Sequence, residues 1–305
     1  MTKPTIAISV GDLNGVGIEI ALKAHENVSK LCSPIYCINK ELLSQASTLL
    51  SIKIPQDFSL KEVEGSFDIQ AGVVDVSSGN YSYDSFICAI QMCEKEEANA
   101  VVTMPIHKEA WMKAGLEYKG HTDLLRQYFD KEAIMMLGCD EMFVALFTEH
   151  VPLKTVPSMI EYKKLKQFFI DFHNAIGNDK VAVLGLNPHA GDNGVLGNEE
   201  LRIYKAIKSA NKKIGIEQFF GPIVPDVAFT PHFRKDFKYF IAMYHDQGLA
   251  PLKALYFDES VNISLNLPIV RTSVDHGTAF DIAYKGNAKT LSYINAIKSA
   301  VDLVI

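Results

Sequence analysis

Short apolar segments alternate with helical segments along nearly the whole chain, and no other feature of the sequence constrains the fold as strongly. The apolar segments have the composition of strands that are buried on both faces. They occupy residues 5–11, 33–39, 99–106, 142–148, 180–188 and 238–245. Helical patterns lie between them, for example at residues 162–177 and 198–215. Strands that alternate with helices predict βαβ units, and therefore a mainly parallel sheet with helices on both faces.

Length and composition exclude several classes of protein. A chain of 305 residues suits about two domains. The net charge of −6 argues against a nucleic-acid surface, and no apolar run is long enough to cross a bilayer. The N-terminal segment lacks the features of a signal peptide. The five cysteines are an odd number without a Cys-x-x-Cys pair, which is typical of reduced thiols in a cytoplasmic protein.

Polar side chains follow five of the predicted strands. Ligands bind beyond the carboxyl ends of parallel strands, so these side chains are candidates for a site. They are Asp12; His107 and Lys108; His150; Asn187 and His189; and His245, Asp246 and Gln247. Four of these strand ends carry a histidine, although the whole chain has only nine.

His245 directly follows the buried segment "YFIAMY", and the residues alone allow two interpretations. It is either a core histidine with satisfied hydrogen bonds or a residue placed at the strand's exit for chemistry. Well-separated histidines at strand ends match a divalent metal site with open coordination positions better than a closed structural site.

Other segments also allow two interpretations. The glycine turn at residues 11–20 either packs closely or lets the backbone approach a ligand at a helix N-terminus. The irregular loop at residues 187–200 is either a surface connection or functional. His121 and Thr122 open a predicted helix, where Thr122 is a candidate N-cap.

Arg271 leaves an apolar segment, where a buried guanidinium needs an anionic partner. Lys253 and Asn262 lie shortly upstream of it. Together the three residues suit a phosphate or carboxylate site, whereas any one alone is as well explained by a salt bridge or a strand-end hydrogen bond.

These segments resemble the 4-hydroxythreonine-4-phosphate dehydrogenase family of vitamin B6 biosynthesis. The matching stretches, from residue 11 to about 288, are "GDLNGVGIEI", "TMPIHKEA", "GHTDLL", "GLNPHAGDNGVLGNEE", "MYHDQGLAPLK" and "VNISLNLPIVRTSVDHGTAFDIA". "DHGTAFDIAYKGNA" is also similar to the dinucleotide loop of isocitrate and isopropylmalate dehydrogenases. The resemblance implies two α/β/α domains around a central cleft, with mainly parallel sheets. We expect residues 1–125 with 275–305 to form the first domain and residues 126–274 the second.

The resemblance also implies roles for individual residues. His150, His189 and His245 would bind a divalent cation (zinc, magnesium or cobalt), with ligands from both subunits of a homodimer. The substrate-binding residues would be His121, Thr122, Lys253, Asn262 and Arg271. Residues Asp275, His276, Gly277 and Thr278 would lie along NAD, with NADP as the alternative. The family usually has Gly where Tyr284 stands, so Tyr284 is expected to crowd this cofactor loop.

The implied reaction is NAD-dependent oxidation of 4-phosphooxy-L-threonine at C3, followed by loss of CO2 to give 3-amino-2-oxopropyl phosphate. Asp246 and Lys253 are the two candidates for the proton acceptor, and Asp246 could instead orient an imidazole. The rival functions are a paralogous dehydrogenase for another phosphorylated hydroxy acid such as a threonate phosphate, a binding module without activity, and a phosphotransacetylase-like acyltransferase.

Overall fold

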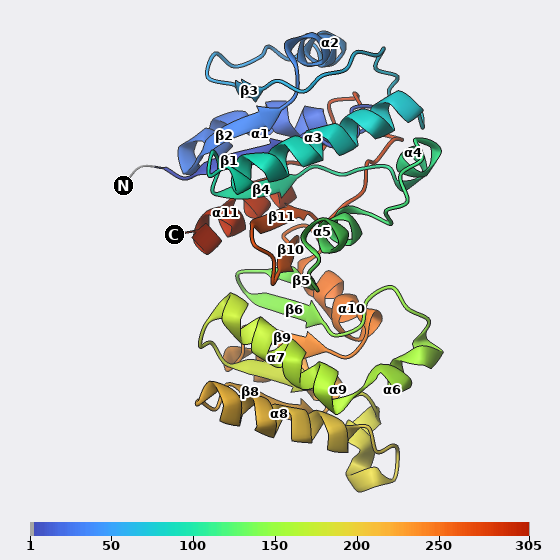
Figure 1. Ribbon diagram of the computed structural model, residues 1–305, viewed down its shortest axis with the longest axis vertical. Coiled ribbons are helices and arrows are strands. Elements are labelled where there is room, and N and C mark those ends of the chain that lie inside the picture. Colours follow the sequence, from blue (N-terminus) through green and yellow to red (C-terminus); the bar gives the residue numbers. More distant parts are fainter. Residues whose placement is uncertain (1–2, 305) are drawn as a thin grey trace. The chain divides into compact units, whose positions relative to one another are not determined.

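The computed structural model describes residues 3–304, and the chain divides into two compact units (Figure 1). Unit 1 is Met1–Lys131 with Val261–Ile305, and unit 2 is Glu132–Ser260. Each unit contains a mainly parallel sheet with helices against it, as the alternating sequence pattern predicts. No helix among the described residues is long and apolar enough to span a membrane.

Unit 1 is built on a sheet with the strand order β3-β2-β1-β4-β11-β10, in which only the β10–β11 pair is antiparallel. Its strands are β1 (Thr5–Ser9), β2 (Ser33–Cys37), β3 (Ser59–Lys61), β4 (Ala100–Thr103), β10 (Val261–Leu265) and β11 (Val270–Val274). Its helices are α1 (Gly17–Leu31), α2 (Lys40–Leu50), α3 (Val76–Glu94), α4 (Lys108–Lys113), α5 (His121–Phe129) and α11 (Leu291–Val304).

Helices cover both faces of this sheet because consecutive residues of a strand point to opposite sides. The Tyr36 hydroxyl of β2 forms a hydrogen bond with His25 of α1, whereas the next residue, Cys37, contacts the Met92 sulfur of α3. Helices α1 and α11 pack together on the side opposite α3 (Figure 1). The central strands β1 and β4 are accordingly almost fully buried.

The unit boundaries differ from the expected domain boundaries at residues 125 and 274. A break after residue 125 would cut α5, which lies wholly in unit 1. Strands β10 and β11 also belong to unit 1, because β11 pairs in parallel with β4 and places Arg271 opposite Val101. The sequence does not show this pairing, since strand partners are chosen by long-range contacts.

Unit 2 is built on a sheet with the order β5-β6-β9-β7-β8, in which only the β5–β6 pair is antiparallel. Its strands are β5 (Ile134–Cys139), β6 (Met142–Leu146), β7 (Val181–Leu184), β8 (Phe219–Ile223) and β9 (Tyr239–Ala242). Its helices are α6 (Val156–Met159), α7 (Tyr162–Ile176), α8 (Glu200–Ile214), α9 (Pro225–Ala228) and α10 (His245–Tyr256), with short 3-10 turns η1 (Leu153–Thr155), η2 (Pro188–Gly194) and η3 (Phe233–Lys235).

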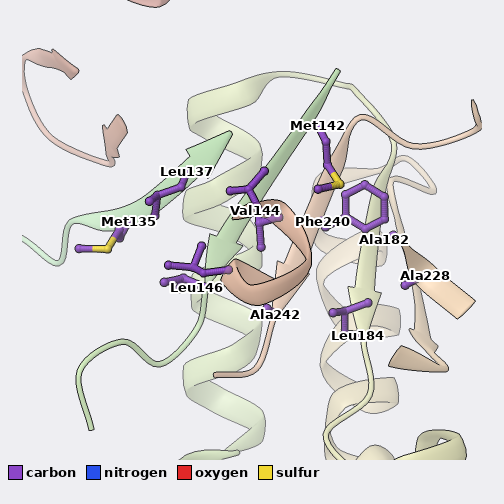
Figure 2. Close-up of a cluster of buried hydrophobic side chains, with 12 residues drawn as sticks. Met135, Leu137, Met142, Val144, Leu146, Ala182, Leu184, Ala228, Phe240 and Ala242 are labelled. Atoms are coloured by element: carbon purple, nitrogen blue, oxygen red, sulfur yellow. The ribbon is translucent and has the colours of Figure 1, made fainter. Parts of the chain in front are cut away.

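Alternate side chains of the unit 2 strands form one buried apolar cluster (Figure 2). Val144 and Leu146 of β6 lie beside Phe240 and Ala242 of β9, and Leu249 of α10 packs against them. The intervening residues face α7, as the contact of Tyr239 with Phe172 shows. The strands are therefore buried on both faces, as their continuous apolar runs predict.

Helix α10 lies against β6 and β9 so closely that glycine is favoured at its fourth position. A Cβ atom on Gly248 would lie 2.5 Å from Val144 Cγ1 and 2.9 Å from Ala242 Cβ. His245 is the first residue of α10, three positions before this close approach.

Candidate active site

Three histidines follow three adjacent parallel strands of unit 2. His150 follows β6, His245 follows β9 and His189 follows β7, and β9 lies between the other two strands. The carboxyl ends of parallel strands meet at one edge of a sheet, so this order directs all three loops to the same edge. The interpretation of His245 as a core residue is wrong, because its side chain is 36% exposed.

His150 and His245 lie close together at this edge. Their ring centroids are 5.3 Å apart. His245 Nδ1 is 2.7 Å from Asp246 Oδ1, which leaves Nε2 as the nitrogen available to a ligand. An imidazole oriented by a carboxylate is the usual arrangement of a metal-binding histidine. The pair thus fits two ligand positions of a divalent cation.

The third predicted ligand is not gathered with this pair. Among residues 3–304, no group of three or more His, Cys, Asp or Glu side chains is arranged to hold a metal ion. His189 lies in η2, where the backbone turns with positive φ angles. A single described chain therefore provides two neighbouring imidazoles and a third on a separate loop.

Thr148, which the strand-end argument did not single out, and Gln247, which it did, join the three loops. Thr148 Oγ1 donates to the Met243 carbonyl at 2.7 Å, which ties the His150 loop to the end of β9. Gln247 accepts from Met243 N–H at 2.7 Å and donates to the Gly185 carbonyl at 2.7 Å. These bonds connect the chain after β6, β9 and β7. Their sequence signal is only that polar residues follow the buried strands.

Unit 1 contains a buried cation without a carboxylate partner. Arg271 of β11 is 2% exposed, and it donates to Thr103 Oγ1 at 2.7 Å and Ser264 Oγ at 3.1 Å. Within residues 3–304 no Asp or Glu forms a salt bridge with it, and its Nε has no hydrogen-bond partner. Burial lowers the pKa of Arg271 to about 9. An unpaired buried guanidinium is costly, so this geometry suits an anionic ligand.

His121 adds a neutral donor or acceptor beside this guanidinium. Its ring lies between Phe86 and Trp111, with centroid distances of 4.7 and 5.7 Å. Burial first, and then the charges of Arg271 and Lys108, hold the pKa of His121 well below the usual histidine range. Its Nε2 is buried and has no hydrogen-bond partner among residues 3–304. Helix α5, which carries His121, belongs to the same unit as β10 and β11 (Figure 1).

The other predicted substrate residues divide between the two units. Thr122 and Asn262 belong to unit 1, and Asn262 Oδ1 is buried without a hydrogen-bond partner in the described part of the chain. Lys253 belongs to α10 of unit 2, where its Nζ lies 5.7 Å from the centre of the Phe257 ring. The expected N-cap role of Thr122 is wrong, because α5 begins at His121 and Gly120 occupies the cap position.

The predicted cofactor loop packs against the glycine turn that precedes α1. Val16 N–H donates to the Thr278 carbonyl at 3.0 Å. A Cβ atom on Gly15 would lie 2.8 Å from the same oxygen, so Gly15 serves close packing of the two segments. Asp275 N–H donates to Ser292 Oγ at 3.1 Å, and His276 is exposed.

Tyr284 supports this region rather than simply crowding it. Its hydroxyl donates to the Leu13 carbonyl at 2.7 Å, which joins the segment after the cofactor loop to the glycine turn. Its φ angle is 61°, a conformation that glycine adopts without strain. The geometry thus explains why glycine suits this position and what the tyrosine hydroxyl contributes.

Comparisons with known proteins identify close relatives. The model of the family described as pyridoxal phosphate biosynthetic protein PdxA matches residues 30–300. A 4-hydroxythreonine-4-phosphate dehydrogenase from Sulfurimonas denitrificans is 75% identical over 303 residues, which cover 99% of each chain. The solved 4-hydroxythreonine-4-phosphate dehydrogenase from Klebsiella pneumoniae has a TM-score of 0.85 at 28% identity and full coverage of both chains. An isocitrate dehydrogenase from Methylococcus capsulatus shares the fold, with a TM-score of 0.50 at 13% identity and coverage of 99% and 85%.

Proposed function

The chain belongs to the PdxA family of pyridoxal phosphate biosynthesis, and on that premise we propose that it oxidises 4-phosphooxy-L-threonine at C3 with NAD. Decarboxylation of the resulting β-keto acid then gives 3-amino-2-oxopropyl phosphate. The family membership confirms the resemblance that the sequence motifs indicate, and the enzyme class follows from it.

One observation carries the choice of a phosphorylated, carboxylated substrate. Arg271 is a fully enclosed guanidinium with no carboxylate partner among the described residues, and His121 lies beside it. A substrate phosphate or carboxylate would supply the missing negative charge. His121 Nε2 and Asn262 Oδ1, both buried and unsatisfied, would hydrogen-bond to the same molecule. Thr122 and Lys253 complete the proposed substrate set.

His150 and His245 would hold a divalent cation (zinc, magnesium or cobalt), with His189 as the third ligand. A bound cation would lower the pKa of the substrate hydroxyl and stabilise negative charge on its oxygen, and NAD would supply the hydride acceptor. Asp246 orients the His245 ring through Nδ1. Because that contact gives Asp246 an orienting role, we assign the proton acceptor to Lys253. Asp275, His276, Gly277 and Thr278 would contact NAD or NADP.

We further propose a homodimer that completes the metal site. The absence of a three-ligand group within the described residues supports ligands from two subunits. Apolar side chains near η2 and α8 are exposed and suit a subunit interface: Val195 is 78% exposed, Leu196 47%, Leu201 63% and Tyr204 49%. The five free thiols support a cytoplasmic location.

NAD reduction with 4-phosphooxy-L-threonine tests the proposal directly. The wild-type chain should form NADH, and a chelator should stop the reaction until a divalent metal is restored. His245→Ala should abolish NADH formation and lower the bound metal while leaving the circular dichroism spectrum unchanged. Normal turnover by this variant would disprove the metal assignment. Faster turnover of a threonate phosphate would identify the paralogous dehydrogenase instead.

A further inference from the structure

The turn that carries His189 has a left-handed backbone. His189, Ala190, Gly191, Asp192 and Asn193 all have positive φ angles, between 43° and 81°. L-residues with a Cβ atom disfavour this conformation, and Ala has no side-chain bond to offset it. Such a run persists only where surrounding contacts impose it, and backbone strain of this kind is concentrated at functional sites.

The carboxylate of Glu200 supplies contacts that hold this turn at its start. Glu200 is 8% exposed, at the first position of α8. Its Oε1 accepts from Leu186 N–H at 2.9 Å and Asn187 N–H at 2.7 Å. Its Oε2 accepts from Asn187 Nδ2 at 3.0 Å. One carboxylate thus satisfies both backbone donors that lead from β7 into the turn.

The glycines of the turn show how closely these groups pack. A Cβ atom on Gly191 would lie 2.6 Å from Glu200 Oε2. A Cβ atom on Gly197 would lie 2.2 Å from Asn187 Nδ2. Glu200 therefore contacts the middle of the turn as well as its first residues, and Asn187 contacts the segment that leaves it.

We propose that Glu200 is a positioning residue that holds the His189 turn in its left-handed conformation and so sets the orientation of the third metal ligand. This inference rests on the proposed metal site. Glu200 contacts the backbone on the amino side of His189 and the turn on its carboxyl side, so the backbone that carries the imidazole is held on both sides. A ligand held in its binding geometry loses less conformational entropy when the metal binds.

Glu199 provides a matched control from the same helix start. Its Oε2 accepts from Asn187 Nδ2 at 2.8 Å and Asn198 N–H at 3.1 Å. Among the described residues, the backbone donors of Leu186 and Asn187 bond to Glu200 and not to Glu199. Glu199→Gln therefore changes the local charge as Glu200→Gln does, but leaves those backbone bonds in place.

The experiment measures Co²⁺ affinity by calorimetry on the full-length protein after removal of metal by a chelator. Loss of a residue that supports a metal ligand typically weakens binding by about 10- to 100-fold. We expect Glu200→Ala near the upper end of that range. Glu200→Gln keeps one acceptor oxygen for the backbone donors, so its loss should be smaller. Glu199→Gln should bind Co²⁺ as the wild-type protein does. Circular dichroism identifies any variant that fails to fold. If Glu200→Ala does not fold, the Co²⁺ affinity of Glu200→Gln tests the proposal.

The results separate this proposal from the metal site on which it rests. If His245→Ala loses Co²⁺ but neither Glu200 variant does, the positioning role is disproved and the metal site stands. An equal loss in Glu199→Gln and Glu200→Gln also overturns the proposal, because it shows a general charge effect. If His245→Ala binds Co²⁺ normally, the proposed metal site itself is wrong.

Discussion

Gln247 donates a hydrogen bond from its Nε2 to the Gly185 carbonyl at 2.7 Å, across the gap between two strand ends of unit 2. The same carboxamide accepts from Met243 N–H at 2.7 Å. One side chain therefore joins the segment that leads to His245 to the segment that leads to His189. The relative placement of these two loops depends on a group with both a donor and an acceptor.

Replacement of this carboxamide by a side chain of similar size should cost stability. Gln247→Leu leaves the Met243 N–H and the Gly185 carbonyl without partners in a buried position. Each such group costs about 1 to 3 kcal/mol, so we expect a loss of about 2 to 6 kcal/mol in the free energy of unfolding. Urea denaturation measures this loss. Gln167→Leu, on the exposed face of α7, should change it little, and an equally stable Gln247→Leu variant would contradict the prediction.

The neutral state of His121 makes stability depend on pH. Burial and the charges of Arg271 and Lys108 lower its folded-state pKa well below 6.5, the ordinary value. Below pH 6.5 the unfolded chain therefore binds a proton that the folded chain does not. Stability is fully present above that pH and falls as the pH drops, by about 1.4 kcal/mol per pH unit for one such group.

Urea denaturation at pH 7.5 and pH 5.5 tests this dependence. His121→Gln should reduce the difference in unfolding free energy between the two pH values, because glutamine does not titrate. The exposed His232 provides the control, and His232→Gln should retain the wild-type difference. An unchanged pH dependence in His121→Gln would show that other groups cause it.

We expect Arg271 to lower the stability of the ligand-free protein and to increase its affinity for the substrate. Its buried charge has no carboxylate partner among the described residues, and burial lowers its pKa to about 9. The folded state therefore carries the desolvation cost of a charged guanidinium. Arg271→Met removes that cost, so the free energy of unfolding without ligand should not fall.

Substrate binding, in contrast to stability, should become weaker in Arg271→Met. Removal of a buried charge partner typically costs about 2 to 5 kcal/mol of binding free energy, so Arg271→Met should weaken substrate binding by at least about 30-fold. Calorimetric titration with 4-phosphooxy-L-threonine measures this effect. Arg202→Met, at an exposed position of α8, should bind the substrate normally. A large loss of stability without loss of affinity would give Arg271 a structural role only.

Residues at strand ends could be predicted from the sequence, whereas the bonds that hold them could not. His150 and His245 follow apolar runs, and the geometry of parallel strands brings such positions together. The bonds of Gln247 and Glu200 depend on backbone groups 62 and 14 residues away in the chain. Local propensity carries no information about those partners. Strand β11 likewise belongs to unit 1 because it pairs with β4, and no local sequence pattern indicates this pairing.

The close contact beneath α10 should make Gly248 intolerant of a methyl group. A Cβ atom there would overlap Val144 Cγ1 and the Ala242 side chain. Overpacking of this kind typically costs about 1 to 3 kcal/mol, so Gly248→Ala should lower the free energy of unfolding by that amount. Gly277→Ala is the control, because its Cβ would meet no atom within 4 Å. Thermal and urea unfolding compare the two variants, and equal stability would contradict the packing argument.

The Tyr284 hydroxyl should contribute to the order of the cofactor region. Tyr284→Phe retains the ring but leaves the Leu13 carbonyl without the donor that lies 2.7 Å away. We expect a loss of about 1 kcal/mol in the free energy of unfolding, the usual contribution of one hydrogen bond. NAD binding, followed by calorimetry, should weaken because the glycine turn loses its link to the segment after Thr278. Tyr128→Phe removes a hydroxyl from a side chain that is 40% exposed and should change neither quantity. If Tyr284→Phe binds NAD as tightly as the wild-type chain, the hydroxyl supports only the fold and not the proposed cofactor loop.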